Sequence, residues 1–169
     1  MPEICTWNWE LIYKFFQTTL AVALLFSAYF LWHRQKKKEI IASEAKDAVK
    51  DLLELLVVNR SIRYENSKSK SELELKLIKF KELSTKVHRS LLFLNRSKQN
   101  EKLNKHLEIF YIRKETTYHS INNVVNNSDV FIILDFLQSD FCTSEIWLLE
   151  ECMESLVNII HPYSLFKRI

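Results

Sequence analysis

The chain has 169 residues, 47% hydrophobic and 27% charged, with 24 Lys and Arg against 21 Asp and Glu and no glycine. Average glycine usage of about 7% would supply roughly twelve, so this composition excludes glycine-built phosphate loops, Asn-Gly hairpins and most sandwich or barrel folds. Because prolines occur only at Pro2 and Pro162, a mainly helical protein is what remains.

Residues 11–32 form the first predicted element, a transmembrane helix. The stretch carries a single charge, at Lys14, and as a helix it spans about 33 Å, which matches a hydrocarbon core of roughly 30 Å. A cleaved signal peptide is disfavoured because there is no basic leader and no A-x-A cleavage site. A buried core helix is disfavoured because a dense run of cations follows the stretch.

Aromatic residues flank the span on both sides and basic residues follow it, and all of them are predicted to lie at the membrane interface. They are Trp7, Trp9, Trp32, Arg34, Lys36, Lys37 and Lys38. Cytoplasmic flanks carry an excess of Lys and Arg, so we expect residues 1–10 on the extracytoplasmic side of the membrane and the chain from residue 33 onward in the cytoplasm. The lipid bilayer is therefore the first predicted partner.

Small and polar residues interrupt the apolar span. Thr19, Ala23 and Ser27 are spaced four residues apart, and Gln17 lies on an adjacent stripe that is also less apolar. Small residues at this spacing let helix backbones approach closely in lipid. The pattern predicts packing between copies, and its polar side chains would also suit a water-filled pore.

After the span, residues 33–58 are predicted to continue as a juxtamembrane helix, and residues 59–169 to form the cytoplasmic helical bundle, which is expected to have four or five helices. Residues 59–71 are polar and predict a loop, and Ser71 with Glu74 forms a capping box that would start the next helix. The apolar stripe of that helix is Leu73, Leu77, Phe80, Val87, Leu91 and Leu94.

A turn over residues 95–100 is expected to lead into a third helix, over about residues 101–120. The residues predicted to face inward on this helix are Leu103, Leu107, Phe110 and Tyr111. Residues 122–128 are rich in Asn, which supports turns without glycine. They therefore predict a break in the helical course of the chain.

Residues 130–137 suit either a buried strand or a short buried helix, and the helix is favoured because no partner strand is evident. The last helix is predicted over about residues 144–160 and is expected to end before Pro162. Its predicted core residues are Ile146, Leu149, Cys152, Leu156 and Ile160. Cys152 in this stripe is most simply a small core residue.

Charge is unevenly distributed over the predicted bundle. Residues 59–114 carry fifteen Lys and Arg against six Asp and Glu, a net +9, whereas residues 115–166 carry eight acidic residues and no Lys or Arg, a net −8. Such separation predicts two faces that meet each other or meet neighbouring copies. The His and Cys residues show no metal-ligand spacing and no C-x-x-C pair, so no metal or cofactor is expected.

One constellation has catalytic character: Arg113 and His119, separated by five residues. In a helical bundle it resembles the R-x4–6-H motif of HEPN domains, although Lys114 stands where that family usually has Asn, His or Asp. The resemblance implies that motifs from two copies form a metal-independent RNA-cleaving site. A histidine would accept the proton of the 2′-hydroxyl, and an arginine would stabilise the phosphorane charge.

The membrane helix, the helical bundle and this motif in a small chain together resemble the small membrane accessory proteins of type VI-B CRISPR-Cas systems. That resemblance implies a bacterial inner-membrane protein that forms a homo-oligomeric ring around a pore and strengthens antiviral defence beside an RNA-guided RNase effector. Because helices are about 10 Å across, about six or more copies are needed to surround water. Two alternatives stay open: a membrane-tethered HEPN-type RNase that holds RNA on its basic segment, and a non-enzymatic tether for a cytoplasmic partner.

Overall fold

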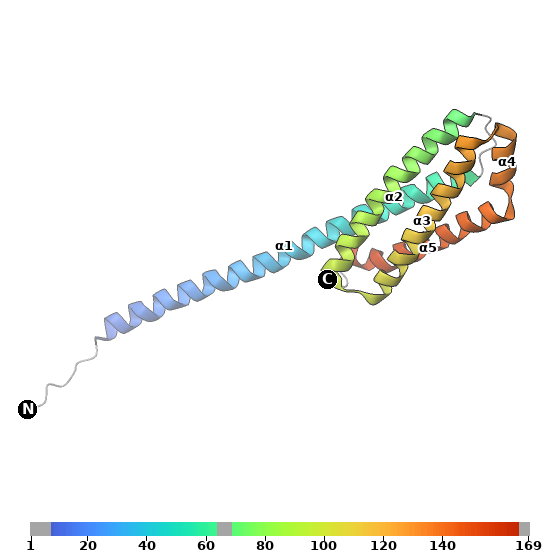
Figure 1. Cartoon of the computed structure of the whole chain (residues 1–169). Coiled ribbons are helices and arrows are strands. Elements are labelled where there is room, and N and C mark those ends of the chain that lie inside the picture. Colours follow the sequence, from blue (N-terminus) through green and yellow to red (C-terminus); the bar gives the residue numbers. More distant parts are fainter. Residues whose placement is uncertain (1–7, 64–68, 166–169) are drawn as a thin grey trace, which may run out of the picture. The chain divides into compact units, whose positions relative to one another are not determined.

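The computed structural model describes residues 8–63 and 69–165, in which all regular structure is helical (Figure 1). The predicted interface residue Trp7 lies outside the described residues, as do residues 64–68 of the predicted loop. The chain divides into two compact units, one up to Glu39 and one from Ile40 onward. The prediction of an all-α protein is confirmed.

The first unit contains the N-terminal part of helix α1, which runs from Trp9 to Arg63. No glycine or proline interrupts this sequence, so the helical hydrogen bonds continue through the apolar span. Leu20 and Phe30 in this span are 62% and 67% exposed. By length and composition, α1 is the one helix among the described residues that is able to cross a membrane, in agreement with the prediction.

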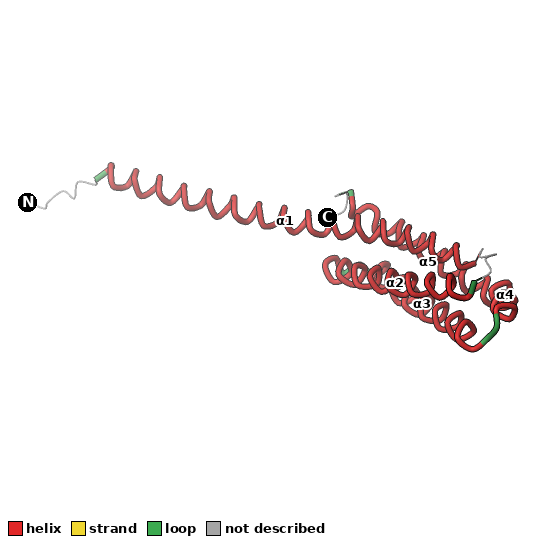
Figure 2. Tube along the Cα trace, turned by 90° about the horizontal axis from the view of Figure 1, so that it is seen from above, coloured by secondary structure: helices red, strands yellow, loops and turns green. Residues whose placement is uncertain are grey.

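The second unit is a bundle of four long helices. The part of α1 from Ile40 onward packs with α2 (Lys70–Lys98), α3 (Glu101–Asn127) and α5 (Asp140–Ser164), while the short α4 (Val130–Gln138) connects α3 to α5. Figures 1 and 2 show α2, α3 and α5 running side by side with this part of α1. The predicted bundle of four or five helices is thus observed.

Side-chain hydrogen bonds identify which helices of the bundle are neighbours. They join Ser90 to Glu44, Asn95 to Asn104, Asn100 to Tyr163 and Asn59 to the Ile146 carbonyl, over 2.6, 2.9, 2.7 and 3.3 Å respectively. The neighbouring pairs are therefore α1–α2, α2–α3, α3–α5 and α5–α1, in the up-and-down order of a four-helix bundle. It follows that α2 and α5 occupy diagonally opposite corners of the bundle.

Apolar stripes at helical spacing fill the core. The six residues predicted for α2 are at most 4% exposed, and the five predicted for α5 are at most 6% exposed. Helix α1 contributes Ala45, Ala48, Leu52 and Leu55, none of which is exposed. Full burial of each large aliphatic side chain stabilises the fold by about 1.5–3 kcal/mol relative to leaving it in water. The buried stripe of α1 therefore makes the part of this helix after Ile40 a member of the bundle.

Helix α1 extends further than the sequence predicts, because the expected loop at 59–71 begins as helix through Arg63. Asn59 is fully buried, and its Nδ2 donates to the Ile146 carbonyl and to Glu150 Oε1, both at 3.3 Å. These two bonds satisfy the amide donor inside the bundle. The boundary predicted at residue 59 is wrong because Asn59 is polar and nevertheless buried.

The start of α2 differs from the capping-box prediction. Ser69 is the N-cap residue, with extended backbone angles (φ −129°, ψ 118°), and Ser71 already lies in the first turn. The Ser69 side chain makes no capping bond to the backbone, and its hydroxyl contacts that of Ser71. The Ser69 carbonyl accepts from the N–H groups of Glu72 and Leu73, so the helix begins before the predicted Ser71 cap.

The turn between α2 and α3 is tighter than the predicted 95–100. Helix α2 runs to Lys98, and Gln99 adopts the left-handed region (φ 47°), from which its N–H bonds the Asn95 carbonyl. Asn100 then caps α3, and its side chain accepts from the N–H of Leu103 at 3.2 Å. Gln99 and Asn100 are sufficient to connect α2 to α3, because the left-handed Gln99 ends one helix and the Asn100 side chain caps the start of the next.

Helix α3 passes through most of the predicted break at 122–128 and ends at its last asparagine. Ile121 and Val125 are at most 1% exposed, and their burial outweighs the weak helix propensity of the asparagines around them. Tyr111, expected to face inward, is 49% exposed, and its ring lies against that of His88 on α2. Both predictions are therefore wrong, although the other three inward residues of α3 are buried.

The stretch 130–137 lies in helix α4, which excludes the strand alternative. Ile133 and Leu137 are buried, but Phe131 is 85% exposed, so only one face of this helix is covered. The chain then passes through Ser139, whose side chain accepts from the N–H of Cys142 and caps α5. Helix α4 thus closes the connection between α3 and α5.

Helix α5 begins earlier and ends later than the predicted 144–160. It starts at Asp140 and includes Pro162 in its last turn, where the missing N–H removes only one hydrogen bond. Tyr163, directly after the proline, is buried, and its hydroxyl accepts from Asn100 at 2.7 Å. This anchoring keeps the last turn helical, so the predicted end before Pro162 is wrong.

Candidate functional site

Arg113 lies near the middle of α3 and points toward α5. Its Nη1 lies 2.7 and 2.9 Å from the two carboxylate oxygens of Glu145, and the two side chains are 34% and 16% exposed. Hydrogen bonds between charged groups at these distances belong to the stronger class. The guanidinium is therefore held in a partly buried ion pair between two helices of the bundle.

His119 lies on a different side of α3. Its side chain is 71% exposed, and its Nε2 is 3.3 Å from Glu115 Oε2, one turn earlier. Because α3 is helical throughout, six residues leave the directions of Arg113 and His119 about 120° apart. The structure does not bring the two predicted catalytic residues together within one copy.

Lys114, the residue that departs from the HEPN motif, is buried. Its side chain is 7% exposed, and its Nζ lies 2.7 Å from Glu115 Oε1 and 5.0 Å from the centre of the Tyr111 ring. The hydrogen bond from Lys114 is the main reason that the pKa of Glu115 lies below its usual value. A buried ammonium needs such partners because an unpaired charge is costly away from water.

His88 of α2 forms a group with Tyr111 and Lys114 of α3 that the sequence did not identify. The His88 and Tyr111 rings are 5.2 Å apart between centroids, and the His88 Nδ1 is buried with no hydrogen-bond partner among the described residues. Burial, and then the charge of Lys114, lower the pKa of His88. Because the members come from two helices at no fixed spacing, no local motif predicts them.

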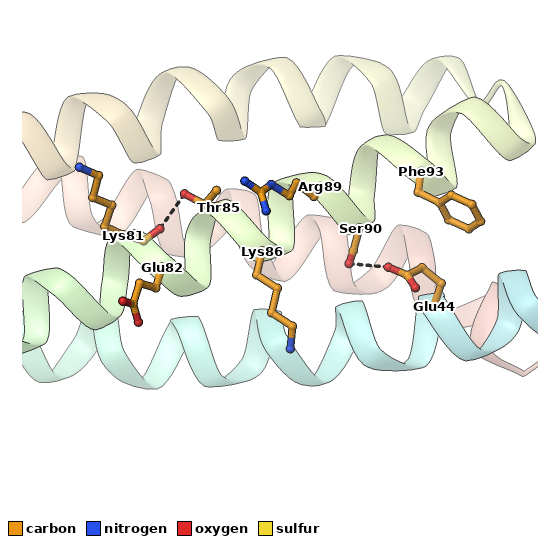
Figure 3. Close-up of a pocket in the computed structure, with 8 residues that line it drawn as sticks. All are labelled: Glu44, Lys81, Glu82, Thr85, Lys86, Arg89, Ser90 and Phe93. Carbon is orange, nitrogen blue, oxygen red and sulfur yellow. Dashed lines mark hydrogen bonds between the residues drawn. The ribbon is translucent and has the colours of Figure 1, made fainter.

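A groove of about 600 Å³ runs along α2 (Figure 3). Its lining residues are Glu44, Lys81, Glu82, Thr85, Lys86, Arg89, Ser90 and Phe93. Lys86 lies 2.8 Å from Asp51 Oδ2, and its hydrogen bond to this carboxylate raises the pKa of Lys86. The Arg89 side chain, in contrast, makes no hydrogen bond or ion pair within the described part of the chain. The groove therefore offers one uncommitted guanidinium.

The polar residues predicted to pack or line a pore differ in how their hydrogen bonds are satisfied. The Thr19 hydroxyl donates to the Phe15 carbonyl, and the Ser27 hydroxyl donates to the Ala23 carbonyl, each at 2.8 Å. The Gln17 side chain makes no hydrogen bond within residues 8–63 and 69–165. Hydrocarbon offers no water to an amide, so an unpaired Gln17 would cost several kcal/mol there.

The regular helix also sets the angle between the two polar stripes of the span. One stripe consists of Thr19, Ala23 and Ser27, and the other of Gln17, Ala21 and Ala28. At about 100° per residue, their mean directions differ by about 140°. They are therefore two separate faces of α1, and each can contact a different neighbour.

The described interface residues lie on solvent-exposed parts of α1. Trp9 and Trp32 are 76% and 60% exposed, and Lys36 pairs with Glu39 at 3.0 Å. The remaining predicted cations of this group are Arg34, Lys37 and Lys38, all on the same helix. Aromatic rings and cations in this order suit the headgroup region of a bilayer.

The two cysteines among the described residues are buried and have raised pKa values. Cys142 and Cys152 are buried free thiols, and burial raises the pKa of each to about 11. Both therefore stay protonated near neutral pH, which makes them poor nucleophiles. Among the described residues, no three His, Cys, Asp or Glu side chains are grouped so that they could hold a metal ion.

Comparison with protein-family models, with curated proteins and with solved structures finds no match to the chain. The HEPN-like and CRISPR-associated identities therefore stay predictions from the resemblance. Three features of the chain's own geometry bear on function: the exposed apolar span with its unpaired Gln17, the ion pair that holds Arg113, and the groove along α2.

Proposed function

We propose that the chain is an oligomeric membrane protein in which the apolar parts of α1 from about six or more copies associate and enclose a pore. The observation that carries the proposal is Gln17, whose amide lies in the exposed apolar span and has no partner within the described residues of one copy. In lipid, a polar group on the facing helix of a neighbouring copy, or water at the lumen, supplies that partner. The bacterial inner membrane and the antiviral role are expectations from the CRISPR resemblance.

The two small-residue faces of α1 support a closed ring of helices. They are about 140° apart, and a helix in a six-membered ring meets its neighbours at about 120°, with larger angles in larger rings. Between the two faces lie Leu20 and Leu24. These leucines would line the lumen as an apolar constriction, which gates by dewetting.

The mass of the complex in mild detergent tests the association. We expect Gln17→Leu to shift the wild-type oligomer toward smaller species, because it removes the unpaired amide. Thr18→Leu is the matched control, since the Thr18 hydroxyl already donates to the Lys14 carbonyl at 2.8 Å. A wild-type protein that stays monomeric would contradict the proposal and favour the non-enzymatic tether.

Dye leakage from liposomes tests the pore. Leu20→Ser should increase leakage because a hydroxyl stabilises water in the constriction, whereas Val22→Ser, on the far side of the helix, should not. Replacing both Ala23 and Ser27 with Leu should block close packing and abolish leakage. An oligomer that leaks in neither the wild-type nor the Leu20→Ser form contradicts the pore and leaves the association standing.

The membrane-tethered HEPN-type RNase is the second candidate, and one observation favours it. His119 is exposed beside the Glu115 carboxylate, a position from which an imidazole can be oriented for a second copy. Because Glu145 already holds Arg113, we expect no RNA cleavage by the purified protein. Cleavage that disappears in His119→Ala would replace the pore with this function.

A further inference from the structure

Helices α2 and α5 carry opposite and equal charge. Helix α2 has eight Lys and Arg against three Glu, a net +5, and α5 has five Asp and Glu with no Lys or Arg, a net −5. The two helices occupy diagonal corners of the bundle, so their outer faces point away from each other. A single copy therefore presents a basic side and an acidic side that cannot meet within that copy.

The outer face of α2 is a continuous stripe. Its residues, spaced four and three apart, are Glu82, Lys86, Arg89, Phe93 and Arg96, and all of them are exposed. Lys86 is bound to Asp51, but Arg89 and Arg96 form no ion pair within the described residues. Phe93, between these two arginines, is 41% exposed.

The outer face of α5 has the same spacing. Its exposed residues are Ser144, Trp147, Glu151, Glu154 and Asn158. Glu154 pairs with Arg60 of α1 at 3.1 Å, whereas Glu151 forms no ion pair among the residues that the structure describes. Trp147 is 53% exposed, and aromatic side chains of this kind are enriched at the centres of protein interfaces.

Contacts with α3 fix the relative heights of these two stripes. His88 packs on Tyr111, and Arg113, two residues further along α3, pairs with Glu145 of α5. Arg89 is therefore level with Trp147, and Glu151 lies at a height between Arg89 and Arg96. If copies stand side by side at equal height, the unpaired carboxylate of Glu151 in one copy faces the unpaired guanidinium groups of Arg89 and Arg96 in the next.

We propose that the α2 face around Arg89, Phe93 and Arg96 binds the α5 face around Trp147 and Glu151 of a second copy. The contact rests on the proposed oligomer and names the surfaces that the bundles use. Because two different surfaces meet, the contact is heterologous, and such contacts close into rings when the rotation permits. One helix pair is a small interface, so it acts together with the packing of the membrane span.

The composition of the groove favours a second copy over a polyanion. Glu44 and Glu82 line the groove together with its cations, and these carboxylates repel a continuous row of phosphates. On the α5 stripe, in contrast, the two acidic side chains are flanked by Ser144 and Trp147 on one side and by Asn158 on the other. A partner that carries both charged and apolar positions therefore complements the groove along α2 better than the uniformly negative backbone of a polyanion does.

Charge reversal in the full chain, measured in mild detergent at low salt, tests the proposal. Arg89→Glu with Arg96→Glu, or Glu151→Arg alone, should each weaken self-association about tenfold or more, because like charges then face each other. Mixing the two variants should restore the large complex. The acidic α2 face of the first variant then meets the basic α5 face of the second, and the native α2 face of the second meets the native α5 face of the first. Lys105→Glu, on the exposed face of α3, is the control and should change nothing.

The outcomes separate this proposal from the proposed function. A wild-type chain that is monomeric overturns both. A wild-type oligomer whose mass is unchanged by these reversals overturns only the α2–α5 contact. Loss of association in the α2 variant without loss in Glu151→Arg, or without recovery in the mixture, also overturns it, because α2 would then bind something other than α5.

Discussion

The two parts of helix α1 share one backbone conformation and differ in their surroundings. Before Glu39, large side chains such as Leu24 and Phe30 are 62% and 67% exposed. After Ile40, Leu52 and Leu55 are not exposed at all. The same residue type, leucine, thus lies on the outside of one unit and in the centre of the other.

The difference teaches that the distribution of polar residues, more than hydrophobicity alone, decides which solvent a helix needs. The first part of α1 is apolar on nearly every face, so no orientation hides it from water and a bilayer is the medium that fits it. The second part buries one apolar stripe against other helices and presents charged residues such as Lys46 and Lys50 on the opposite side. Each prediction below changes one side of this contrast.

Thiol labelling should separate the two parts completely. A maleimide on a polymer too large to pass a pore should label Cys5 in spheroplasts, whose outer membrane is opened, and Lys105→Cys, which is exposed on α3, only after lysis. Cys5 itself lies outside the described residues. The added cysteine is necessary because the native Cys142 and Cys152 are buried and would resist labelling on either side.

The control for this experiment is the chain without the added cysteine, which should gain little label on lysis. Labelling of Lys105→Cys before lysis, with Cys5 protected until lysis, would show that the orientation is the reverse of the one proposed. The positive-inside argument from Arg34 and Lys36 to Lys38 would then be wrong.

Truncating one leucine in each part should have very different effects on stability. Leu52→Ala removes a fully buried side chain and should lower the free energy of unfolding of the bundle by about 2–5 kcal/mol. Leu20→Ala should leave this value unchanged, because Leu20 is 62% exposed in the first unit. Chemical denaturation followed by circular dichroism would compare the variants, and equal losses would contradict the division into two units.

Arg113→Ala and His119→Ala should differ in the same way within the candidate catalytic pair. Arg113→Ala leaves Glu145, 16% exposed, without its partner and should cost about 1–3 kcal/mol. His119→Ala removes an exposed side chain and should change stability by no more than about 0.5 kcal/mol. Denaturation midpoints would measure both, and an unchanged Arg113→Ala would mean that the ion pair does not stabilise the bundle.

Much of the fold is predictable because burial follows helical spacing. The stripes from Leu73 to Leu94 and from Ile146 to Ile160 identify α2 and α5 directly. The helix ends are not predictable in this way. Asn59 and Val125 lie in helices only because tertiary contacts bury them, and sequence composition carries no information about those contacts.

The candidate site was predictable only in its residue types. The sequence identifies Arg113 and His119 as a pair, but their directions depend on whether α3 continues between them, and it does. Which basic residues pair with which acidic residues is likewise decided by the tertiary structure. Arg60 and Arg113 pair with acidic residues of α5, so part of the predicted charge complementarity is satisfied within one copy.

The smallest expected effect concerns His88 and the pH dependence of bundle stability. Burial and then Lys114 lower the pKa of His88 in the folded state, against a partial opposing effect of Glu115. The unfolded chain therefore binds the proton more readily. The stability of the bundle loses nothing to His88 well above about pH 6.5, and it falls as the pH drops below this value. His88→Gln should reduce this fall between about pH 7.5 and pH 5.5, measured by denaturation midpoints. The exposed His161→Gln is the control and should keep the wild-type slope, and an equally steep fall in His88→Gln would show that His88 is not its source.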